Sequence, residues 1–182
     1  MKGIVFTELL EMTEARYGYE VVDYMLDTDL PSGGIYTSVG TYTTKEFGIL
    51  RQRFIERTGM AGDEFDVNFG IHIMRYFART ESVYFTKHNT ALEFLVEMRD
   101  FFREYSHRTD PDIVIPEIST QRVGDHEVLM EYRSFRKMGR FMEGMMRGVF
   151  EEYGEMCEIS REHANQEGDY IQFRIRSIQP VP

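Results

Sequence analysis

The residues with the clearest potential for chemistry are Tyr132, Ser134 and Arg136, which alternate with Arg133 and Phe135. The run from 127 to 131 before them predicts a strand, and side chains in a strand alternate between its two faces. Tyr132, Ser134 and Arg136 would then line one edge together. A phenol, a hydroxyl and a guanidinium suit an anion with several oxygens, above all a carboxylate. The alternative interpretation is a solvated strand face.

Length and composition predict one folding unit. The chain has 182 residues, of which 42% are hydrophobic and 14% aromatic, and this favours a packed globule. Its 14 Phe and 12 Met residues predict a bulky, adaptable interior that could line a large apolar pocket, with an ordinary irregular core as the alternative. We expect a single domain over 1–182, with a helical N-terminal subdomain over 1–60 and helices plus a sheet over 61–182.

Charge and cysteine usage narrow the class of partner. The formal charge of −10 opposes binding to nucleic acid or to an anionic membrane face, so we expect neither partner. Cys157 is the only cysteine, which excludes an intrachain disulfide and favours a reducing compartment. An early acidic residue, Glu8, argues against a secretory leader, and no apolar run approaches the length of a membrane span. We therefore expect a cytoplasmic protein.

Apolar periodicity predicts that the N-terminal half is helical. Residues three and four apart are apolar in several segments, and glycines or Thr residues stand at the expected helix ends. Gly70 falls in the middle of one such segment, where a close approach by a ligand or another backbone would explain it. The helices are predicted over 3–17, 20–27, 44–58, 63–80, 90–105 and 137–153, with irregular structure over 81–89.

The periodicity changes after Asp110-Pro111, where two hairpins are predicted. The first pairs 113–123 with 126–135, and the second pairs 155–163 with 170–178 across a polar turn. The last helix lies between the hairpins, which gives the order ββαββ. The fold class is therefore α+β, with a helical N-terminal half packed on an antiparallel sheet of about four strands.

The order and spacing of these pieces resemble the heme nitric oxide/oxygen-binding (H-NOX) domain, the sensor domain also found in soluble guanylate cyclase. The resemblance covers essentially the whole chain. It rests on the opening run 1–5, on Tyr17-Gly18 followed by Val21-Val22-Asp23, on Gly70, on Pro116 at the entry to the first hairpin, and on Tyr132-x-Ser134-x-Arg136. In that family the last three residues hold the two propionates of a heme. The resemblance thus implies heme as the cofactor.

The resemblance also assigns the remaining pocket residues and exposes one departure from the family. Family members ligate the iron through a histidine on the helix that matches 90–106, and Phe102 stands at that place here. Phenylalanine cannot bind iron, and Tyr105 or His107 are the only neighbouring substitutes. The predicted pocket residues beyond the anchor are Val5, Leu9, Ile73, Phe77, Met98, Phe102, Pro116 and Phe141.

Three of these positions indicate which gas a bound heme would take. Leu9, Ile73 and Phe141 match the distal side, where some family members hydrogen-bond oxygen, and all three are apolar. The resemblance therefore implies nitric oxide or carbon monoxide as the gas. The remaining histidines, at 72, 88, 126 and 163, lack the spacing of a helical metal pair.

Two functions remain open at this point. The first is a sensor of heme, or of another apolar molecule with carboxylates, that signals through a separate cyclase or kinase. The second is a heme-free regulatory module whose pocket is packed shut. No nucleophile and base pair, phosphate loop or metal motif supports an enzyme.

Overall fold

The structure, a computed structural model, describes residues 1–27, 29–110 and 114–178. The described residues form seven helices and four strands. The chain divides into two compact units, Met1–Phe69 and Gly70–Pro182. A single domain with a subdomain boundary near residue 60 stays a prediction.

The first unit is helical. It contains α1 (Gly3–Tyr17), α2 (Tyr19–Leu26), α3 (Thr44–Thr58) and the first turns of α4 (Gly62–Thr80). The Thr43 hydroxyl caps α3 by accepting a hydrogen bond from the Glu46 N–H at 3.1 Å. Gly59 ends the same helix in the left-handed conformation, with a φ of 71°. These local signals place the helix ends where the sequence predicts them.

The core of this unit is aromatic, and one carboxylate is buried within it. Phe6 stacks on Tyr36 with ring centroids 4.8 Å apart. Glu46 is 1% exposed, and its Oε1 accepts hydrogen bonds from the Tyr36 hydroxyl at 2.8 Å and from the Ser32 N–H at 3.2 Å. The carboxylate of Glu46 therefore holds the loop before α3 against that helix.

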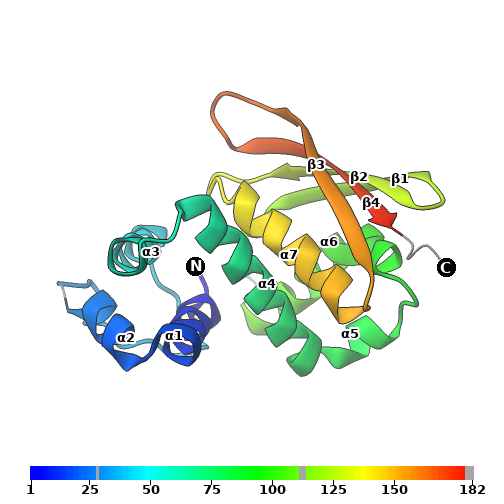
Figure 1. The fold of residues 1–182 in the computed structure, drawn as a ribbon. Coiled ribbons are helices and arrows are strands. Elements are labelled where there is room, and N and C mark those ends of the chain that lie inside the picture. Colours follow the sequence, from blue (N-terminus) through cyan, green and yellow to red (C-terminus); the bar gives the residue numbers. More distant parts are fainter. Residues whose placement is uncertain (28, 111–113, 179–182) are drawn as a thin grey trace. The chain divides into compact units, whose positions relative to one another are not determined.

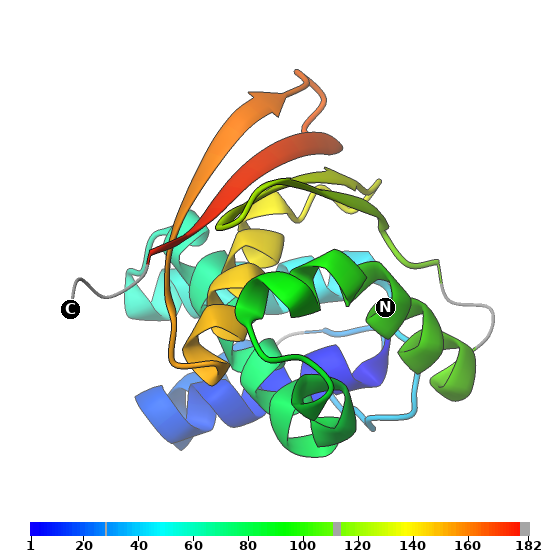
Figure 2. The ribbon, with the colours of Figure 1, turned by 90° about the vertical axis from the view of Figure 1, so that its right-hand side faces the viewer.

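The second unit contains the sheet. Its strands are β1 (Glu117–Gly124), β2 (Glu127–Arg133), β3 (Met156–Ala164) and β4 (Tyr170–Ile178), antiparallel in the order β1-β2-β4-β3. The helices of this unit are the rest of α4, α5 (Ser82–Thr86), α6 (Ala91–Thr109) and α7 (Gly139–Glu152). Figures 1 and 2 both show α6 and α7 lying against one face of the sheet. The predicted ββαββ order and the α+β class are confirmed.

The two faces of the sheet differ in chemistry. Val128, Met130 and Tyr132 of β2 are buried on the face that packs against the helices. On the other face, Glu127 pairs with Arg174 and Arg176 of β4. One buried face and one charged face explain the alternation that identified these strands.

A glycine allows α4 and α7 to meet at the backbone. A Cβ added at Gly70 would lie 2.2 Å from the Phe141 carbonyl oxygen and 2.7 Å from the Met145 nitrogen. The close approach that the sequence suggested for Gly70 is thus an approach by another backbone, that of α7.

Several predicted element ends are wrong. The segment 81–89 contains α5, which is too short to show a helical period. The helix α6 continues to Thr109, and the Ser106 and Thr109 hydroxyls donate to carbonyls one turn earlier, at Phe102 and Tyr105. The strand predicted from 113 begins at Glu117, and Ile113 and Pro111 lie outside the described residues. The strand predicted through 135 ends at Arg133.

Candidate carboxylate-binding site

Tyr132 occupies the inner face of β2 near its end. Its register partners are Ile118 on β1 and Ile171 on β4, and all three side chains are buried. Burial raises the pKa of the Tyr132 hydroxyl, while Ser134, the Met138 backbone and Arg136 act in the opposite direction. The phenol is therefore a neutral hydrogen-bond donor that lies close to the other two predicted anchor residues.

Ser134 and Arg136 reach Tyr132 through a turn and not through strand alternation. The Ser134 carbonyl accepts from the Lys137 N–H at 3.0 Å, and the Ser134 hydroxyl accepts from the Arg136 N–H at 3.3 Å. A serine that bonds the backbone two residues on is a typical turn former. The turn closes with Lys137 at a φ of 54°, which non-glycine residues rarely adopt. The predicted grouping of the three residues is right, but the predicted strand geometry is wrong.

Arg136 is a half-buried cation with no carboxylate partner among the residues that the structure describes. Its Nη1 donates to the Val114 carbonyl at 2.8 Å, and its guanidinium lies 4.5 Å from the Phe135 ring centroid. Within the described residues, no Asp or Glu lies within ion-pair distance of it. Burial lowers the pKa of Arg136, which means that the charged form bears a desolvation cost. A bound carboxylate would offset that cost.

The helix α6 carries Phe102, the residue that the resemblance predicts at the family's iron-ligand position. Phe101 is 2% exposed and packs on Phe85 and Phe94, whereas Phe102 is half-exposed. Phe101, and not Phe102, is therefore the more deeply buried of these two neighbours on α6. Met98, one turn earlier, is fully buried.

The two candidate substitutes for the ligand, Tyr105 and His107, differ in their surroundings. Burial raises the pKa of the Tyr105 phenol to about 12. Its ring lies 4.9 Å from that of Phe77, in a packed aromatic cluster. His107 is exposed on the last turns of α6, past the helix end that the sequence predicts at 105.

The other predicted pocket residues fall in both units. In the first unit, Leu9 is fully buried and Val5 half-buried, both on α1. In the second unit, Ile73 and Phe77 of α4 are buried. Phe141 on α7 and Pro116, just before β1, are half-buried.

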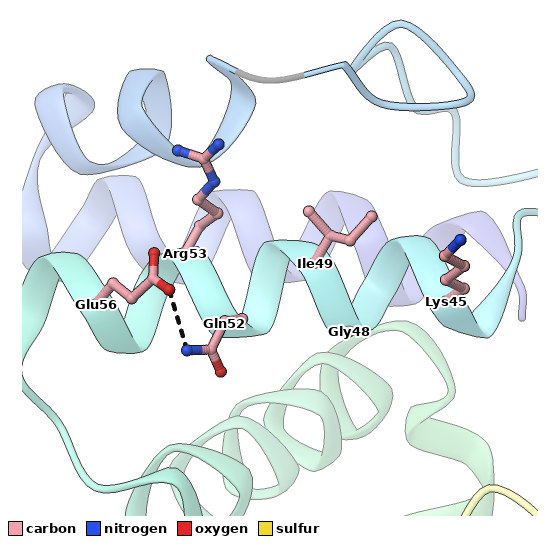
Figure 3. Close-up of a pocket in the computed structure, with 6 residues that line it drawn as sticks. All are labelled: Lys45, Gly48, Ile49, Gln52, Arg53 and Glu56. Atoms are coloured by element: carbon pink, nitrogen blue, oxygen red, sulfur yellow. Dashed lines mark hydrogen bonds between the residues drawn. The ribbon is translucent and has the colours of Figure 1, made fainter.

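Two small cavities lie away from these residues. A depression of about 270 Å³ on α3 is lined by Lys45, Gly48, Ile49, Gln52, Arg53 and Glu56, all from that one helix. In Figure 3, Arg53 and Gln52 extend to different sides of α3. Arg53 lies 5.4 Å from the Tyr24 ring centroid, and Gln52 donates to Glu56 at 3.1 Å. Polar groups that satisfy one another and diverge do not form a ligand site.

The second cavity, of about 40 Å³, surrounds His88 at the start of α6. The His88 Nδ1 lies 2.9 Å from the Tyr84 carbonyl, and its Nε2 lies 3.1 Å from Glu97. This space is close to that of one water molecule. His88 therefore has a structural role, in which it contacts the Tyr84 carbonyl and Glu97.

The residues that the structure describes include neither a metal cluster nor a membrane-spanning helix. Among the residues that the structure describes, no group of three or more His, Cys, Asp and Glu side chains is arranged to hold a metal ion. No described helix combines the length and apolar character that crossing a membrane requires.

The family model for haem-NO-binding domains matches residues 2–161. The chain belongs to the H-NOX family. This is a family of heme-binding gas sensors, so the predicted resemblance is confirmed. H-NOX domains are sensor domains and not catalysts, and the prediction of a non-enzyme is confirmed on that ground.

Solved structures of H-NOX proteins share the fold along their full length. The Fe(II) unliganded H-NOX protein from K. algicida is 27% identical, with a TM-score of 0.91, over 100% of this chain and 99% of that one. The H-NOX protein from S. oneidensis in the Fe(II)NO ligation state is 21% identical, with a TM-score of 0.90, over 98% of this chain and 100% of that one. The second likeness concerns the fold alone. No curated protein matches the chain.

Proposed function

We propose that this H-NOX domain binds heme through the heme's two carboxylates, which Tyr132, Ser134 and Arg136 hold. The observation that supports this most is Arg136, a half-buried cation with no carboxylate within ion-pair distance in the described part of the chain. A guanidinium offers paired N–H donors to a carboxylate, and two neighbouring hydroxyls can satisfy its remaining lone pairs. The solved K. algicida relative, at 27% identity, carries Fe(II).

The described residues fit the carboxylates of heme better than they fit its iron. Phe102 stands at the family's ligand position, Tyr105 is a high-pKa phenol in a packed cluster, and His107 is exposed. We therefore propose that the anchor and apolar contacts hold the cofactor, and that α6 supplies no iron ligand at position 102. Bound heme would supply the capacity to bind a diatomic gas.

The proposed gas is nitric oxide or carbon monoxide. Ile73 on α4 and Phe141 on α7 match the family's distal positions, and neither side chain can donate a hydrogen bond to dioxygen. We propose that the ligand state is read by a separate cytoplasmic signalling protein, a cyclase or a kinase, because a sensor domain carries no output of its own.

Phe102 also favours a second candidate function, a heme-free regulatory module with a collapsed pocket. The two candidates assign different roles to Arg136. As an anchor, its replacement by alanine weakens uptake of heme and leaves a folded protein. As a structural residue, it holds Val114 beside the turn, and its loss changes stability or partner binding instead.

The test is an absorption spectrum of the protein produced with supplementary heme. The wild type is expected to show a Soret band, and Phe102→His is expected to shift that band to the form typical of an imidazole-ligated iron. Val96→His places a histidine on the exposed side of the same helix and is the matched control, with no shift expected. Absence of a Soret band in both the wild type and Phe102→His would exclude heme binding and favour the heme-free module.

A further inference from the structure

The turn between β2 and α7 exposes a large aromatic side chain. Phe135 is 64% exposed, although its two neighbours in the chain, Ser134 and Arg136, belong to the proposed carboxylate anchor. Val114, which precedes β1, is 60% exposed. Aromatic side chains are enriched where proteins bind one another, because they bury a large apolar area with little loss of conformational freedom. An exposed Phe beside an exposed Val therefore marks a candidate contact surface.

Arg136 joins these two side chains into one surface. Its guanidinium lies 4.5 Å from the Phe135 ring centroid, and the same group donates to the Val114 carbonyl at 2.8 Å. The backbone of the turn is fixed by the Lys137 N–H, which donates to the Ser134 carbonyl at 3.0 Å. A surface that is rigid before binding loses less conformational entropy when a partner docks.

The turn carries several cations, although the protein as a whole has a negative net charge. Arg133, Arg136 and Lys137 fall within five successive positions of a protein of formal charge −10. The run from 132 to 142 contains no acidic residue, while Glu131 and Glu143 flank it and Arg140 pairs with Glu143 at 3.0 Å. Lys137 is exposed and makes no ion pair with any residue that the structure describes. The Arg133 Nε lies 3.9 Å from Glu117, the outer limit of an ion pair. Complementary charge on a partner would therefore be attracted here.

We propose that the turn surface, formed by Val114, Phe135 and Lys137 with the guanidinium group of Arg133, docks an acidic segment of a partner protein. The segment carries an apolar side chain that covers Phe135 and carboxylates that meet the cations. The small size of the surface favours a short segment over a membrane or a nucleic acid, because those extended polyanions would also face the rest of a strongly acidic chain.

The proposal does not depend on heme. Val114 and Phe135 reach the proposed heme anchor only through Arg136, and Lys137 is not one of its residues, so the heme spectrum of each variant is recorded beside its peptide affinity. A loss of docking with an unaltered heme spectrum, or the reverse, identifies which proposal has failed.

The experiment selects random peptides displayed on phage against the heme-free protein, with counter-selection on a Phe135→Ala/Lys137→Glu double variant. Both side chains are exposed, so the variant is expected to keep the wild-type circular dichroism spectrum and unfolding midpoint. The matched control is Val123→Ala/Arg122→Glu, which makes the same kinds of change at exposed positions on the other end of the hairpin.

The selected peptides are expected to combine Asp or Glu with a neighbouring apolar residue. Fluorescence anisotropy with a labelled selected peptide should show a loss of affinity of about tenfold or more in Phe135→Ala and in Lys137→Glu, and a change of less than about twofold in the control. Affinity should also fall as the salt concentration rises.

Three outcomes would overturn the proposal. The first is a selected set with no acidic excess, and the second is equal binding by the wild type and the double variant. The third concerns vesicles of phosphatidylserine and phosphatidylcholine. If these bind the wild type but not the double variant while no peptide does, the surface is a membrane contact and not a protein-docking site.

Discussion

Replacing Gly70 by alanine tests the closest contact between helices in the second unit. The added Cβ would lie 2.2 Å from the Phe141 carbonyl oxygen, 2.7 Å from the Met145 nitrogen and 2.9 Å from the Gly144 carbonyl carbon. Ordinary contacts between non-bonded heavy atoms are about 3.5 Å or longer, so α4 and α7 would have to separate by about 1 Å. All three contacted atoms belong to the backbone and cannot rotate away.

The magnitude follows from two opposing effects. Alanine favours a helix over glycine by about 1 kcal/mol. Overpacking costs about 1–3 kcal/mol, and more when rigid atoms are displaced at several contacts. Three contacts with rigid atoms place the overpacking cost in the upper part of that range, and the helix preference of alanine offsets about 1 kcal/mol of it. We therefore expect Gly70→Ala to lower the free energy of unfolding by about 1–2 kcal/mol in total, with a fall in melting temperature of roughly 2–4 °C for each kcal/mol.

Gly48→Ala is the matched control. Gly48 lies in the middle of α3, and an added Cβ there meets no atom within 4 Å. The same substitution should then raise the free energy of unfolding by about 0.5–1 kcal/mol. Urea denaturation of the wild type and both variants, followed by far-ultraviolet circular dichroism, measures the difference. If Gly70→Ala is as stable as Gly48→Ala, the backbone contact between α4 and α7 does not constrain the fold and the reasoning is wrong.

Three further predictions concern buried polar groups. Burial would raise the pKa of Glu143, but Arg147 and Arg140 outweigh it and hold the pKa below its ordinary value of 4.5. The ion pairs of Glu143 thus stabilise the fold fully above that pH, and they stabilise it less as the pH falls through the folded-state pKa. Glu143→Gln should therefore lower the free energy of unfolding by about 1–3 kcal/mol at neutral pH. Urea denaturation at several pH values should also show a weaker loss of stability toward acid pH in this variant than in the wild type. Glu46→Ala leaves the Ser32 and Tyr36 hydroxyls without their acceptor and should cost about 1–3 kcal/mol, which thermal unfolding measures; an unchanged midpoint would show that the carboxylate does not hold the loop. Tyr105→Phe should leave the heme spectrum unchanged, and a lost or shifted Soret band would instead identify Tyr105 as an iron ligand.

The element types were predictable because their local signals agree with the tertiary contacts. Thr43 and Thr90 cap the helices that follow them, and Gly18 and Gly59 adopt the positive φ that ends the helices before them. Alternation located β2 because one face of the sheet is buried and the other charged. Signals of this kind depend on a few neighbouring residues, which a sequence displays directly.

The features that the sequence did not predict depend on contacts between distant residues. At the end of β2 the Ser134 N–H donates to the Asp169 carbonyl at 2.8 Å, and the chain then turns. The cations from 133 to 140 were visible in the sequence, but the chain's net charge of −10 obscured them.

The candidate site likewise combines features that its residue types predict with features that only the fold determines. The residue types of Tyr132, Ser134 and Arg136 predicted a carboxylate anchor, and the structure brings the three together by a turn that the strand interpretation missed. The environment of Arg136 could not be predicted from the sequence, because its contacts with Val114 and Phe135 depend on the fold. The same holds for the absence of an ion-paired carboxylate in the described part of the chain. The pocket roles of the remaining residues stay predictions.

The most direct test of the account compares protoporphyrin IX, which contains no iron, with its dimethyl ester, in which both carboxylates are blocked. The anchor acts on carboxylates and not on the metal, so the wild type should bind protoporphyrin IX in a fluorescence titration. It should bind the ester about tenfold or more weakly, and Arg136→Ala should remove most of this difference. Equal affinity for the acid and the ester, or the same preference for the acid in Arg136→Ala, would contradict the account.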